Sequence, residues 1–487
     1  MPPSPRQPLR VLFATPECAP LVKTGGLGDV SGALPPALAE LGIDVRILLP
    51  GYTPVLEQCR GAPAVATLEA LGHEVRVLES RLDGNVPVLV LDCPRLYARG
   101  GGPYQADDGE DWEDNPLRFG VLSKCAALLG SAASPLEWRP DVVHCNDWPT
   151  ALAPVYLHFD PGRHAATVTT LHNLAFQGLF PFSAVRALEL PEAALGTEGM
   201  EFHGRASFLK GGIVFSDAVT TVSPTYAREI QGPELGFGLE GVLSAKGEAL
   251  HGVLNGIDTA LWNPQADPHL ASAYGPLTLE RKAANKRLLR KRFGLQGRED
   301  LPLLGCVSRI THQKGMDVVA AAIPHLTKIP AQIAIVGTGD REMTAALKAA
   351  HARDPANVGL VVGFDEALAH LVEGGADIFL MPSRFEPCGM NQMYSQRYGT
   401  PPVANATGGL VDTIVDDVDG KNAEATGFLI PEPTVEALVA GVERAVAAYR
   451  DPARWKRLQL RGMTRDFGWG PAARAYRKIY AKLRSTS

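Results

Sequence analysis

The sequence has few cysteines and no arrangement of them that is typical of metal binding or of a disulfide framework. Its seven cysteines are widely spaced and include no CxxC pair, which argues against a zinc ribbon and a small disulfide-stabilised scaffold. Positive charge is not in excess either, since 47 lysines and arginines face 53 aspartates and glutamates, for a net charge of −6. This balance offers no general attraction for nucleic acid or anionic lipid. Any anion that the protein binds must therefore meet local cations.

Long hydrophobic runs and internal repeats are also missing. No run approaches the roughly 20 apolar residues that cross a bilayer, and the apolar stretch from Val11 is interrupted by Pro16 and Glu17. With 487 residues, of which 45% are hydrophobic and 21% charged, the chain can bury sizeable cores in two or three domains. We expect a cytoplasmic globular protein with no membrane and no nucleic-acid partner.

Short runs of apolar residues alternate with stretches of helical period. In the first half they lie at 9–15, 44–50, 87–93, 141–147, 166–173 and 218–223, and in the second half at 301–309, 331–337, 358–363, 376–383 and 401–406. Their residues are apolar in succession, as in parallel strands that helices cover on both faces. The pattern predicts two doubly wound α/β domains with a linker near 255–270. Such sheets bind ligands beyond the carboxyl ends of their strands, so residues at those ends are site candidates.

A glycine-rich loop follows the first strand. Residues 23–29 read KTGGLGD, and Gly25 and Gly26 permit a close backbone approach where a helix begins. Free amide groups at a helix N-terminus, together with Lys23, suit a diphosphate. The spacing matches neither the GxGxxG nor the Walker A pattern, which disfavours nicotinamide and P-loop readings. A plain strand-to-helix turn is the alternative, and the proline pair at 35–36 predicts a kink or break in the helix.

Two cations follow the first strand of the second predicted domain. Arg309 and Lys314 are five residues apart, so that one turn can aim both at one anion. Two cations on a diphosphate stabilise the negative charge that grows there when the bond to a leaving diphosphate breaks. These two cations can take the place of a metal ion. Metal-dependent transferases usually have an Asp-x-Asp pair near a strand end, whereas the only such pair in this sequence, at 417–419, lies in a polar loop late in the chain. We therefore expect neither a metal ion nor a cofactor; a solvated surface pair is the alternative.

Polar residues also end several predicted strands. Glu386 follows an apolar strand and a Ser-Arg turn, where a carboxylate can accept hydrogen bonds from hydroxyl groups and favour positive charge on a nearby carbon. It can equally cap a helix that begins near Gly389. Asp147 ends the fourth strand and is either a hydroxyl acceptor or a helix cap. His172 and Asn173 end the fifth strand, and a lone histidine is more often structural than catalytic.

Motifs in a shared order carry a resemblance along nearly the whole chain. They include KTGGLGD at 23–29, DWEDN at 111–115, NDW at 146–148, HN at 172–173, NGID at 255–258, SRITHQKG at 308–315, SRFEPCG at 383–389, TGGL at 407–410 and DFGW at 466–469. In these segments the chain resembles the bacterial glycogen synthases and plant starch synthases. Members of that family add glucose from a nucleotide sugar to an α-1,4-glucan.

The resemblance implies an α/β fold of two Rossmann-like domains facing across a cleft, the GT-B architecture. It places an N-terminal starch-synthase catalytic domain on the acceptor side at 1–260, a nucleotide-sugar-binding domain at 261–465, and a C-terminal helix that packs back on the first domain at 466–487. The implied reaction moves glucose from ADP-glucose to the non-reducing 4-OH of an α-1,4-glucan, with retention of configuration. UDP-glucose as donor, a phosphorolytic enzyme and a catalytically silent glucan-binding homologue are the alternatives, and the oligomeric state stays open.

The resemblance also implies which residues form the site. Catalytic roles fall on Glu386, His172, Lys23, Arg309 and Lys314. Substrate contacts fall on Gly25, Gly26, Asp29, Asp147, Asn173, Asn255, Phe364, Cys388, Gly389, Asn391, Thr407, Gly408 and Gly409. Among these, Phe364 is expected to stack on the nucleobase, and the helix that begins at 407–409 to present amide groups to phosphate. Asn391 resembles the plant starch synthases, because many bacterial members have threonine at this position.

Overall fold

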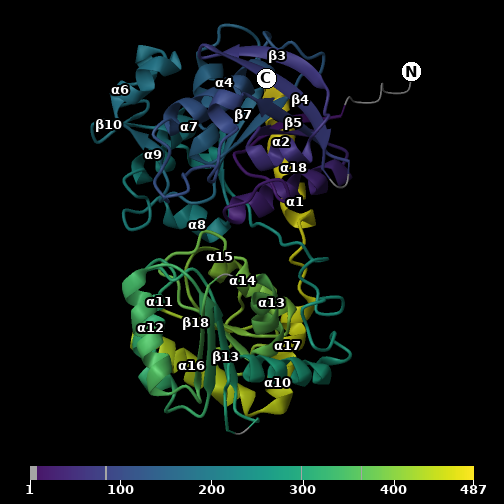
Figure 1. The fold of residues 1–487 in the computed structure, drawn as a ribbon, viewed down its shortest axis with the longest axis vertical. Coiled ribbons are helices and arrows are strands. Elements are labelled where there is room, and N and C mark those ends of the chain that lie inside the picture. The colour runs from purple at the N-terminus through teal and green to yellow at the C-terminus, as the bar shows by residue number, and fades with distance from the viewer. Residues whose placement is uncertain (1–7, 83–84, 298, 364, 487) are drawn as a thin grey trace. The chain divides into compact units, whose positions relative to one another are not determined.

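Figure 1 shows the computed structural model of the chain, which describes residues 8–82, 85–297, 299–363 and 365–486. The chain forms two compact units. Unit 1 comprises Met1–Gly256 and Trp469–Ser487, and unit 2 comprises Ile257–Gly468. The chain therefore passes between the units twice, at residues 256–257 and at residues 468–469. Each unit is built around a sheet that helices cover on both faces (Figure 1).

Unit 1 contains a nine-stranded sheet. Its order is β12 (Leu250–Gly252), β11 (Ala218–Thr221), β7 (Ala166–Leu171), β6 (Val142–Asn146), β1 (Arg10–Ala14), β2 (Asp44–Pro50), β5 (Pro87–Asp92), β4 (His73–Arg81) and β3 (Ala64–Ala70). All six apolar runs predicted in the first half form parallel strands of this sheet. Beyond β5 the sheet turns antiparallel. Strands β3 and β4 were not predicted, because they contain no continuous apolar run. Their residues alternate between buried and exposed, as in half-exposed antiparallel strands.

The helices of unit 1 begin with α1 (Gly26–Glu40). The others are α2 (Thr53–Gln58), α3 (Pro94–Tyr97), α4 (Asn115–Gly130), α5 (Leu152–His158), α6 (Phe182–Val185), α7 (Phe208–Phe215), α8 (Pro224–Glu229), α9 (Glu240–Ala245) and α18 (Gly470–Thr486). A small sheet joins β8 (Leu179–Phe180), β10 (Arg205–Ser207) and β9 (Glu201–Phe202). The C-terminal helix α18 buries Tyr476 and Tyr480 in the core of unit 1. The Tyr480 hydroxyl lies 2.7 Å from Nδ1 of His144 on β6.

Helix α1 continues through Pro35 and Pro36, so the predicted break is wrong. A proline inside a helix leaves the carbonyl four residues earlier without its amide donor. For Pro35 that carbonyl belongs to Ser31, and it accepts a hydrogen bond from the Cys18 thiol at 3.4 Å. The apolar face of the helix, which includes Val30 and the buried leucines 34 and 38, packs into the core of unit 1. A side-chain donor and core packing thus support a helix that its sequence alone disfavours.

Unit 2 contains a six-stranded parallel sheet. Its order is β15 (Val358–Val362), β14 (Gln332–Gly337), β13 (Leu303–Val307), β16 (Ile378–Met381), β17 (Pro402–Asn405) and β18 (Phe428–Ile430). Its helices are α10 (Lys282–Arg292), α11 (Met316–Leu326), α12 (Arg341–Arg353), α13 (Glu366–Gly375), α14 (Asn391–Arg397), α15 (Gly408–Thr413), α16 (Val435–Tyr449) and α17 (Pro452–Thr464). All five runs predicted in the second half are strands.

Successive residues of these strands feed two separate cores. Leu304 and Cys306 of β13 pack with α11 and α16 on one face, whereas Leu303 packs with α10 and α13 on the other. The same helices lie on opposite sides of the sheet in Figure 1. Burial on both faces explains why the strands are apolar at successive positions. Among the residues that the structure describes, no helix has the length and apolar character needed to span a bilayer.

Candidate active site

The glycine-rich loop of unit 1 is held by an acidic residue that the sequence motifs did not single out. One carboxylate oxygen of the buried Glu17 accepts hydrogen bonds from the amides of Thr24 and Gly25 at 2.6 and 3.1 Å. Its other oxygen accepts a 2.7 Å hydrogen bond from the Tyr104 hydroxyl. The Gly25 amide, predicted to be free for a diphosphate, is therefore bonded within the protein. Gly26 begins α1, so its amide belongs to the first turn, where an α-helix leaves its amide groups without intrahelical partners.

Lys23 extends from the same loop. Its ammonium group lies 2.7 Å from the Asp29 carboxylate, and about half of the lysine side chain is exposed. The aspartate stands in the first turn of α1, where a negative charge is favourable to the helix dipole. The pair places a solvent-accessible cation at the N-terminus of α1. This cation and the first-turn amides have the chemistry that an anionic group requires.

The carboxyl ends of β1, β6 and β7 meet at a cluster of polar residues. Asn146 is the last residue of β6, and His172 follows the last residue of β7. Nε2 of His172 lies 3.0 Å from Oδ1 of Asn146. The His172 amide donates to Asp147 at 2.7 Å, and the Asn173 amide also bonds to that carboxyl. The predicted residues at 147, 172 and 173 are thus brought together. Asp147 stands at the N-cap of the short 3₁₀ helix Trp148–Thr150, but its side chain makes no capping hydrogen bond there and accepts these amides instead.

Two members of this cluster have strongly shifted pKa values. Burial lowers the pKa of His172 to about 3, so its ring is neutral near pH 7. Burial also raises the pKa of Asp147 to about 7, against the opposing effect of the two amide hydrogen bonds and with a smaller contribution from the charge of Glu17. The backbone of Asp147 has a φ of 56°, a conformation that costs a non-glycine residue about 1–3 kcal/mol. Shifted pKa values and backbone strain are both enriched at functional sites.

The raised pKa of Asp147 predicts a stability that depends on pH. Between the ordinary value of 3.8 and about 7, the folded state binds more protons at this carboxyl than the unfolded state does. The stability that this group contributes is therefore complete below pH 3.8 and is lost as the pH rises to 7. Asp147→Asn does not ionise, so the unfolding free energy of the variant minus that of the wild type should increase across this range. Denaturant titrations at pH 4, 5.5 and 7 measure it; a constant difference would contradict the shift.

Asn255, near the end of unit 1, supplies a further unpaired polar atom. Its side chain is 7% exposed, and its Oδ1 has no hydrogen-bond donor among the described residues. A buried amide oxygen without a donor costs free energy unless a ligand or water supplies one. This residue was predicted to contact sugar, and its oxygen is suited to accept a hydrogen bond from a hydroxyl group.

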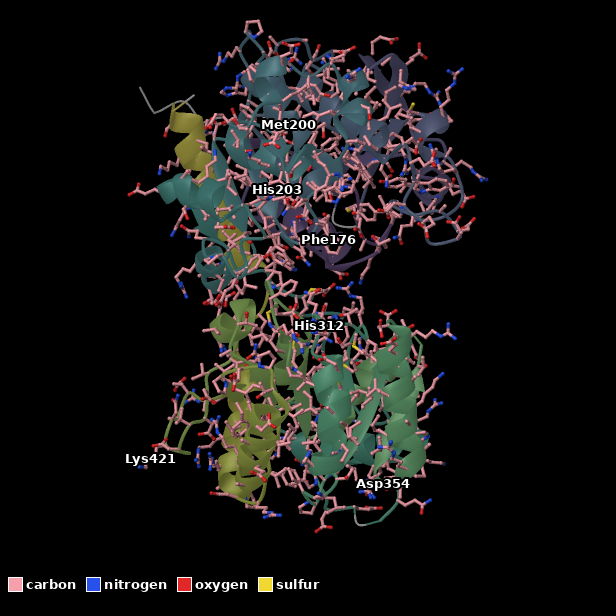
Figure 2. The ribbon with its side chains drawn as sticks, turned by 90° about the vertical axis from the view of Figure 1, so that its left-hand side faces the viewer. Phe176, Met200, His203, His312, Asp354 and Lys421 are labelled. Carbon is pink, nitrogen blue, oxygen red and sulfur yellow. The ribbon has the colours of Figure 1, made fainter. Side chains whose placement is uncertain are left out.

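In unit 2 two loops that follow β13 and β16 lie directly against each other. Gly315 has a φ of 67°, and a Cβ atom at this position would stand 2.1 Å from the Pro382 carbonyl oxygen. The Arg384 guanidinium donates two 2.7 Å hydrogen bonds to Asp317 and a third to the carbonyl of His312, which is labelled in Figure 2. Lys314 lies between His312 and Asp317, the two residues that Arg384 contacts, and directly precedes Gly315. These contacts fix its position relative to the second loop.

Lys314 forms a mostly buried ion pair with Glu386. Its Nζ lies 2.5 Å from Oε2 of Glu386, to which the Ser383 hydroxyl donates at 3.1 Å. The side chains of lysine and glutamate are 18% and 7% exposed. Arg309 is exposed, and its side chain has no partner among the described residues. Of the two predicted cations, Lys314 is therefore paired and mostly buried, whereas Arg309 is exposed. The alternative that Glu386 caps a helix is wrong, because Met390 is the N-cap residue of α14.

The start of α15 packs against the same loop. A Cβ atom at Gly408 would stand 2.0 Å from the Glu386 carbonyl oxygen, and one at Gly409 the same distance from that of Cys388. The Gly409 amide donates to the Glu386 carbonyl at 3.0 Å, so this amide, predicted to face phosphate, is bonded within the protein. Glycine is required here for close backbone packing. Thr407 is buried beside it.

Three further predicted residues surround this loop. Cys388 is buried, and Gly389 has a φ of 71°, which glycine adopts without strain. Asn391 begins α14 and donates through Nδ2 to the Val307 carbonyl at the end of β13, at 2.7 Å. The amide side chain thus connects the N-terminus of α14 to the end of β13. Phe364, predicted to stack on a nucleobase, lies outside the described residues.

Comparisons with known proteins match the whole span of these loops. Residues 10–245 match the family model of the starch synthase catalytic domain, and residues 289–458 match that of the glycosyl transferases group 1. Curated glycogen synthases from Aromatoleum aromaticum and Nitrosomonas eutropha are 53% and 52% identical to the chain. The alignments cover 98% and 99% of this chain and 98% and 97% of the relatives. The chain belongs to the glycogen and starch synthase family.

A solved structure supports the same assignment. The catalytic domain of starch synthase IV from Arabidopsis thaliana, solved with ADP and acarbose, matches with a TM-score of 0.86 and 32% identity, over 98% of this chain and 100% of that one. Sucrose-phosphate synthase from Thermosynechococcus elongatus matches with a TM-score of 0.60 and 19% identity, over 98% and 100% of the two chains, which shows the fold alone. This family member is a glycosyltransferase of the GT-B fold.

Other features of this glycosyltransferase lie apart from the predicted residues. Asp417 of the Asp-x-Asp pair is buried in an ion pair with Arg454 at 2.8 Å, so it has a structural partner. Tyr97 is fully buried in the core. Phe176, by contrast, follows Asn173 in the same loop and is 56% exposed (Figure 2).

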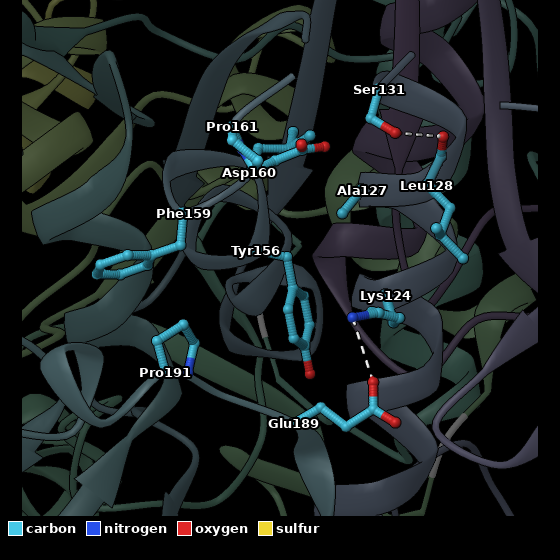
Figure 3. Close-up of a pocket in the computed structure, with 11 residues that line it drawn as sticks. Lys124, Ala127, Leu128, Ser131, Tyr156, Phe159, Asp160, Pro161, Glu189 and Pro191 are labelled. Carbon is cyan, nitrogen blue, oxygen red and sulfur yellow. Dashed lines mark hydrogen bonds and ion pairs between the residues drawn. The ribbon is translucent and has the colours of Figure 1, made fainter. Parts of the chain in front are cut away.

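A cavity of about 280 Å³ in unit 1 is also separate from the predicted residues (Figure 3). Lys124 of α4 and Tyr156 of α5 contribute to its lining. The lysine Nζ lies 3.4 Å from the Glu189 carboxylate and 4.5 Å from the centre of the tyrosine ring. The cation in this cavity is thus already engaged by protein groups.

Proposed function

We propose that this protein is a glycogen synthase that transfers glucose from ADP-glucose to the non-reducing 4-OH of an α-1,4-glucan, with retention of configuration and release of ADP. The observation that carries the proposal is the Lys314–Glu386 ion pair of unit 2, held by Ser383 at the end of a parallel strand. A cation and a carboxylate side by side are the groups that a breaking glycosyl diphosphate bond requires. The glycogen synthase relatives and the ADP-bound starch synthase support the acceptor and the donor.

The chemistry of unit 2 follows from charge development. As the C–O bond to the diphosphate breaks, negative charge grows on the leaving group and positive charge on the anomeric carbon. Arg309 and Lys314 neutralise the first, and the Glu386 carboxylate stabilises the second. Because Glu386 is mostly buried, its field is screened less than that of a surface carboxylate. The retained configuration is consistent with an electrostatic role for this carboxylate.

Unit 1 supplies hydrogen-bonding groups and one accessible cation. The neutral ring of His172, the unpaired Oδ1 of Asn255 and the carboxyl of Asp147 bind sugar hydroxyls. Lys23 adds a cation at the N-terminus of α1. In this proposal unit 1 is the acceptor-side catalytic domain and unit 2 is the nucleotide-sugar-binding domain, where Phe364 contacts the base.

An assay of nucleotide release tests the function directly. With glycogen as acceptor, ADP-glucose should give sustained ADP release, and UDP-glucose a kcat/KM lower by about ten-fold or more because the base contacts differ. A chelator such as EDTA should leave the rate unchanged, since protein cations neutralise the diphosphate. New α-1,4 linkages, detected by NMR, would establish retention. Glycogen binding without turnover of either nucleotide sugar would instead identify a catalytically silent homologue.

A further inference from the structure

The side chain of Asn146 bridges the ends of two strands that flank its own. In the sheet of unit 1, β6 lies between β1 and β7. Nδ2 of Asn146 donates a 3.0 Å hydrogen bond to the carbonyl of Ala14, the last residue of β1. Its Oδ1 lies 3.0 Å from Nε2 of His172, which follows β7. The side chain is 1% exposed, so water does not compete for either contact.

These two contacts determine where the proton of the histidine ring resides. If the amide of Asn146 were flipped, its oxygen would face the Ala14 carbonyl oxygen, and two acceptors would meet in a buried position. The amide therefore keeps its orientation, with Oδ1 toward the ring. An amide oxygen only accepts hydrogen bonds, so Nε2 of His172 must carry a hydrogen atom. A neutral imidazole has one such hydrogen, which leaves Nδ1 with a free lone pair.

Nδ1 of His172 has no hydrogen-bond partner within the described part of the chain, and the ring is only partly buried. The titratable groups around it are His144 on β6, which is itself buried, and Asp147, which accepts the backbone amide of His172. The Glu17 carboxylate acts on Asp147 from the neighbouring loop. None of these groups is shown to donate to Nδ1, so this nitrogen is available to a ligand.

We propose that Asn146 is a positioning residue that holds His172 as the Nε2–H tautomer, so that Nδ1 accepts a hydrogen bond from a hydroxyl group of the transferred sugar. The sugar contact rests on the proposed function, whereas the tautomer does not. In this state His172 orients the sugar by accepting a hydrogen bond from it at Nδ1. It cannot supply a proton to the leaving group through Nδ1.

Ring ¹⁵N NMR spectra of the full-length, histidine-labelled protein test the tautomer, with His172 assigned by comparison with His172→Gln. The wild type should show a protonated Nε2 and a bare Nδ1. Asn146→Leu removes the acceptor, and its ring should lose this preference, while kcat/KM for sugar transfer falls about ten-fold, the loss of one neutral hydrogen bond. A proton on Nδ1 in the wild type, or an unchanged ring in the variant, would overturn the proposal. These spectra remain decisive if neither nucleotide sugar is a substrate.

A second variant provides a readout that structural damage does not mimic. In Asn146→Asp a carboxylate faces Nε2 and favours the doubly protonated ring, in which Nδ1 no longer accepts. The acidic limit of activity should therefore move to higher pH than in the wild type, and superimposable pH profiles would refute the role of Asn146. Asn285→Asp is the matched control: Asn285 is buried in unit 2 with both amide ends bonded to the backbone of Ser272. It should lose stability and keep the wild-type pH profile.

Discussion

Replacing Glu386 with glutamine should lower kcat for sugar transfer by about 10²–10³-fold, the cost of removing one preorganised electrostatic group from an active site. Glutamine keeps the size of the side chain but loses the negative charge that we propose stabilises the anomeric carbon. ADP binding should change little, because in the proposed function the diphosphate is bound by the cations Arg309 and Lys314. Initial rates of ADP release and calorimetric titration with ADP measure the two effects. A variant that retains more than a tenth of the wild-type kcat would remove Glu386 from the catalytic residues.

The matched control for this experiment is Glu373→Gln. Glu373 belongs to α13 of the same unit and is fully buried, and burial raises the pKa of its carboxyl well above the ordinary range. Burial thus favours the protonated acid, which is close in shape and charge to glutamine. Sugar transfer by this variant should match the wild type. Equal losses in the two variants would mean that any buried carboxyl in unit 2 is equally sensitive to the change.

Replacing Lys314 with alanine should reduce both stability and activity. The ammonium group pairs at 2.5 Å with a carboxylate that is only 7% exposed, so its removal leaves a buried, unpaired charge. Breaking a buried ion pair in this way costs about 3 kcal/mol or more of unfolding free energy. In the proposed function the variant also loses a cation that neutralises the leaving diphosphate, so kcat should fall about 10²-fold or more. Denaturant unfolding and ADP-release rates measure the two losses separately.

The double variant Lys314→Met/Glu386→Leu separates stability from catalysis. Once both charges are gone, no buried charge is unpaired, and most of the lost unfolding free energy should return while activity stays absent. Lys286→Met is the control, because Lys286 forms a comparable pair with Asp377, at 2.7 Å and with side chains 11% and 12% exposed. The Lys286→Met variant should lose stability in the same way but keep the wild-type activity. If the double variant were as unstable as Lys314→Ala, the unpaired charge would not be the cause.

The sequence was informative about elements whose signal is local. A strand buried on both faces must be apolar at successive residues, and every run with this pattern is a strand of one of the two sheets. Strands β3 and β4 were missed because each exposes alternate residues. The prolines at 35–36 predicted a helix break that does not occur, because the donor that compensates for one of them, the Cys18 thiol, comes from outside the helix. Local patterns contain no record of such outside partners.

In the candidate site too, the sequence motifs identified residues but not the contacts between distant segments. The motifs at 383–389 and 308–315 include both Glu386 and Lys314, yet they are 72 residues apart and nothing in either motif predicts that they pair. Glu17 and Asn146 were overlooked as functional residues, since their partners are backbone or ring atoms of other segments. The same holds for Gly25 and Gly409, whose amides the glycine patterns assign to phosphate although each is bonded to a protein oxygen.

The amino-acid order alone therefore determined most of the parallel strands, the family and the residue types that gather at the strand ends, because periodicity and motifs are properties of neighbouring residues. Only the tertiary structure decided the partners: the ammonium of Lys314 on Glu386, the carboxylate of Glu17 on its loop, and the amide of Asn146 on the ring of His172. Hydrogen bonds and ion pairs act over a few ångströms between segments that are distant in the chain. Their energies, and the pKa shifts that burial adds, exist only once folding has brought those segments together.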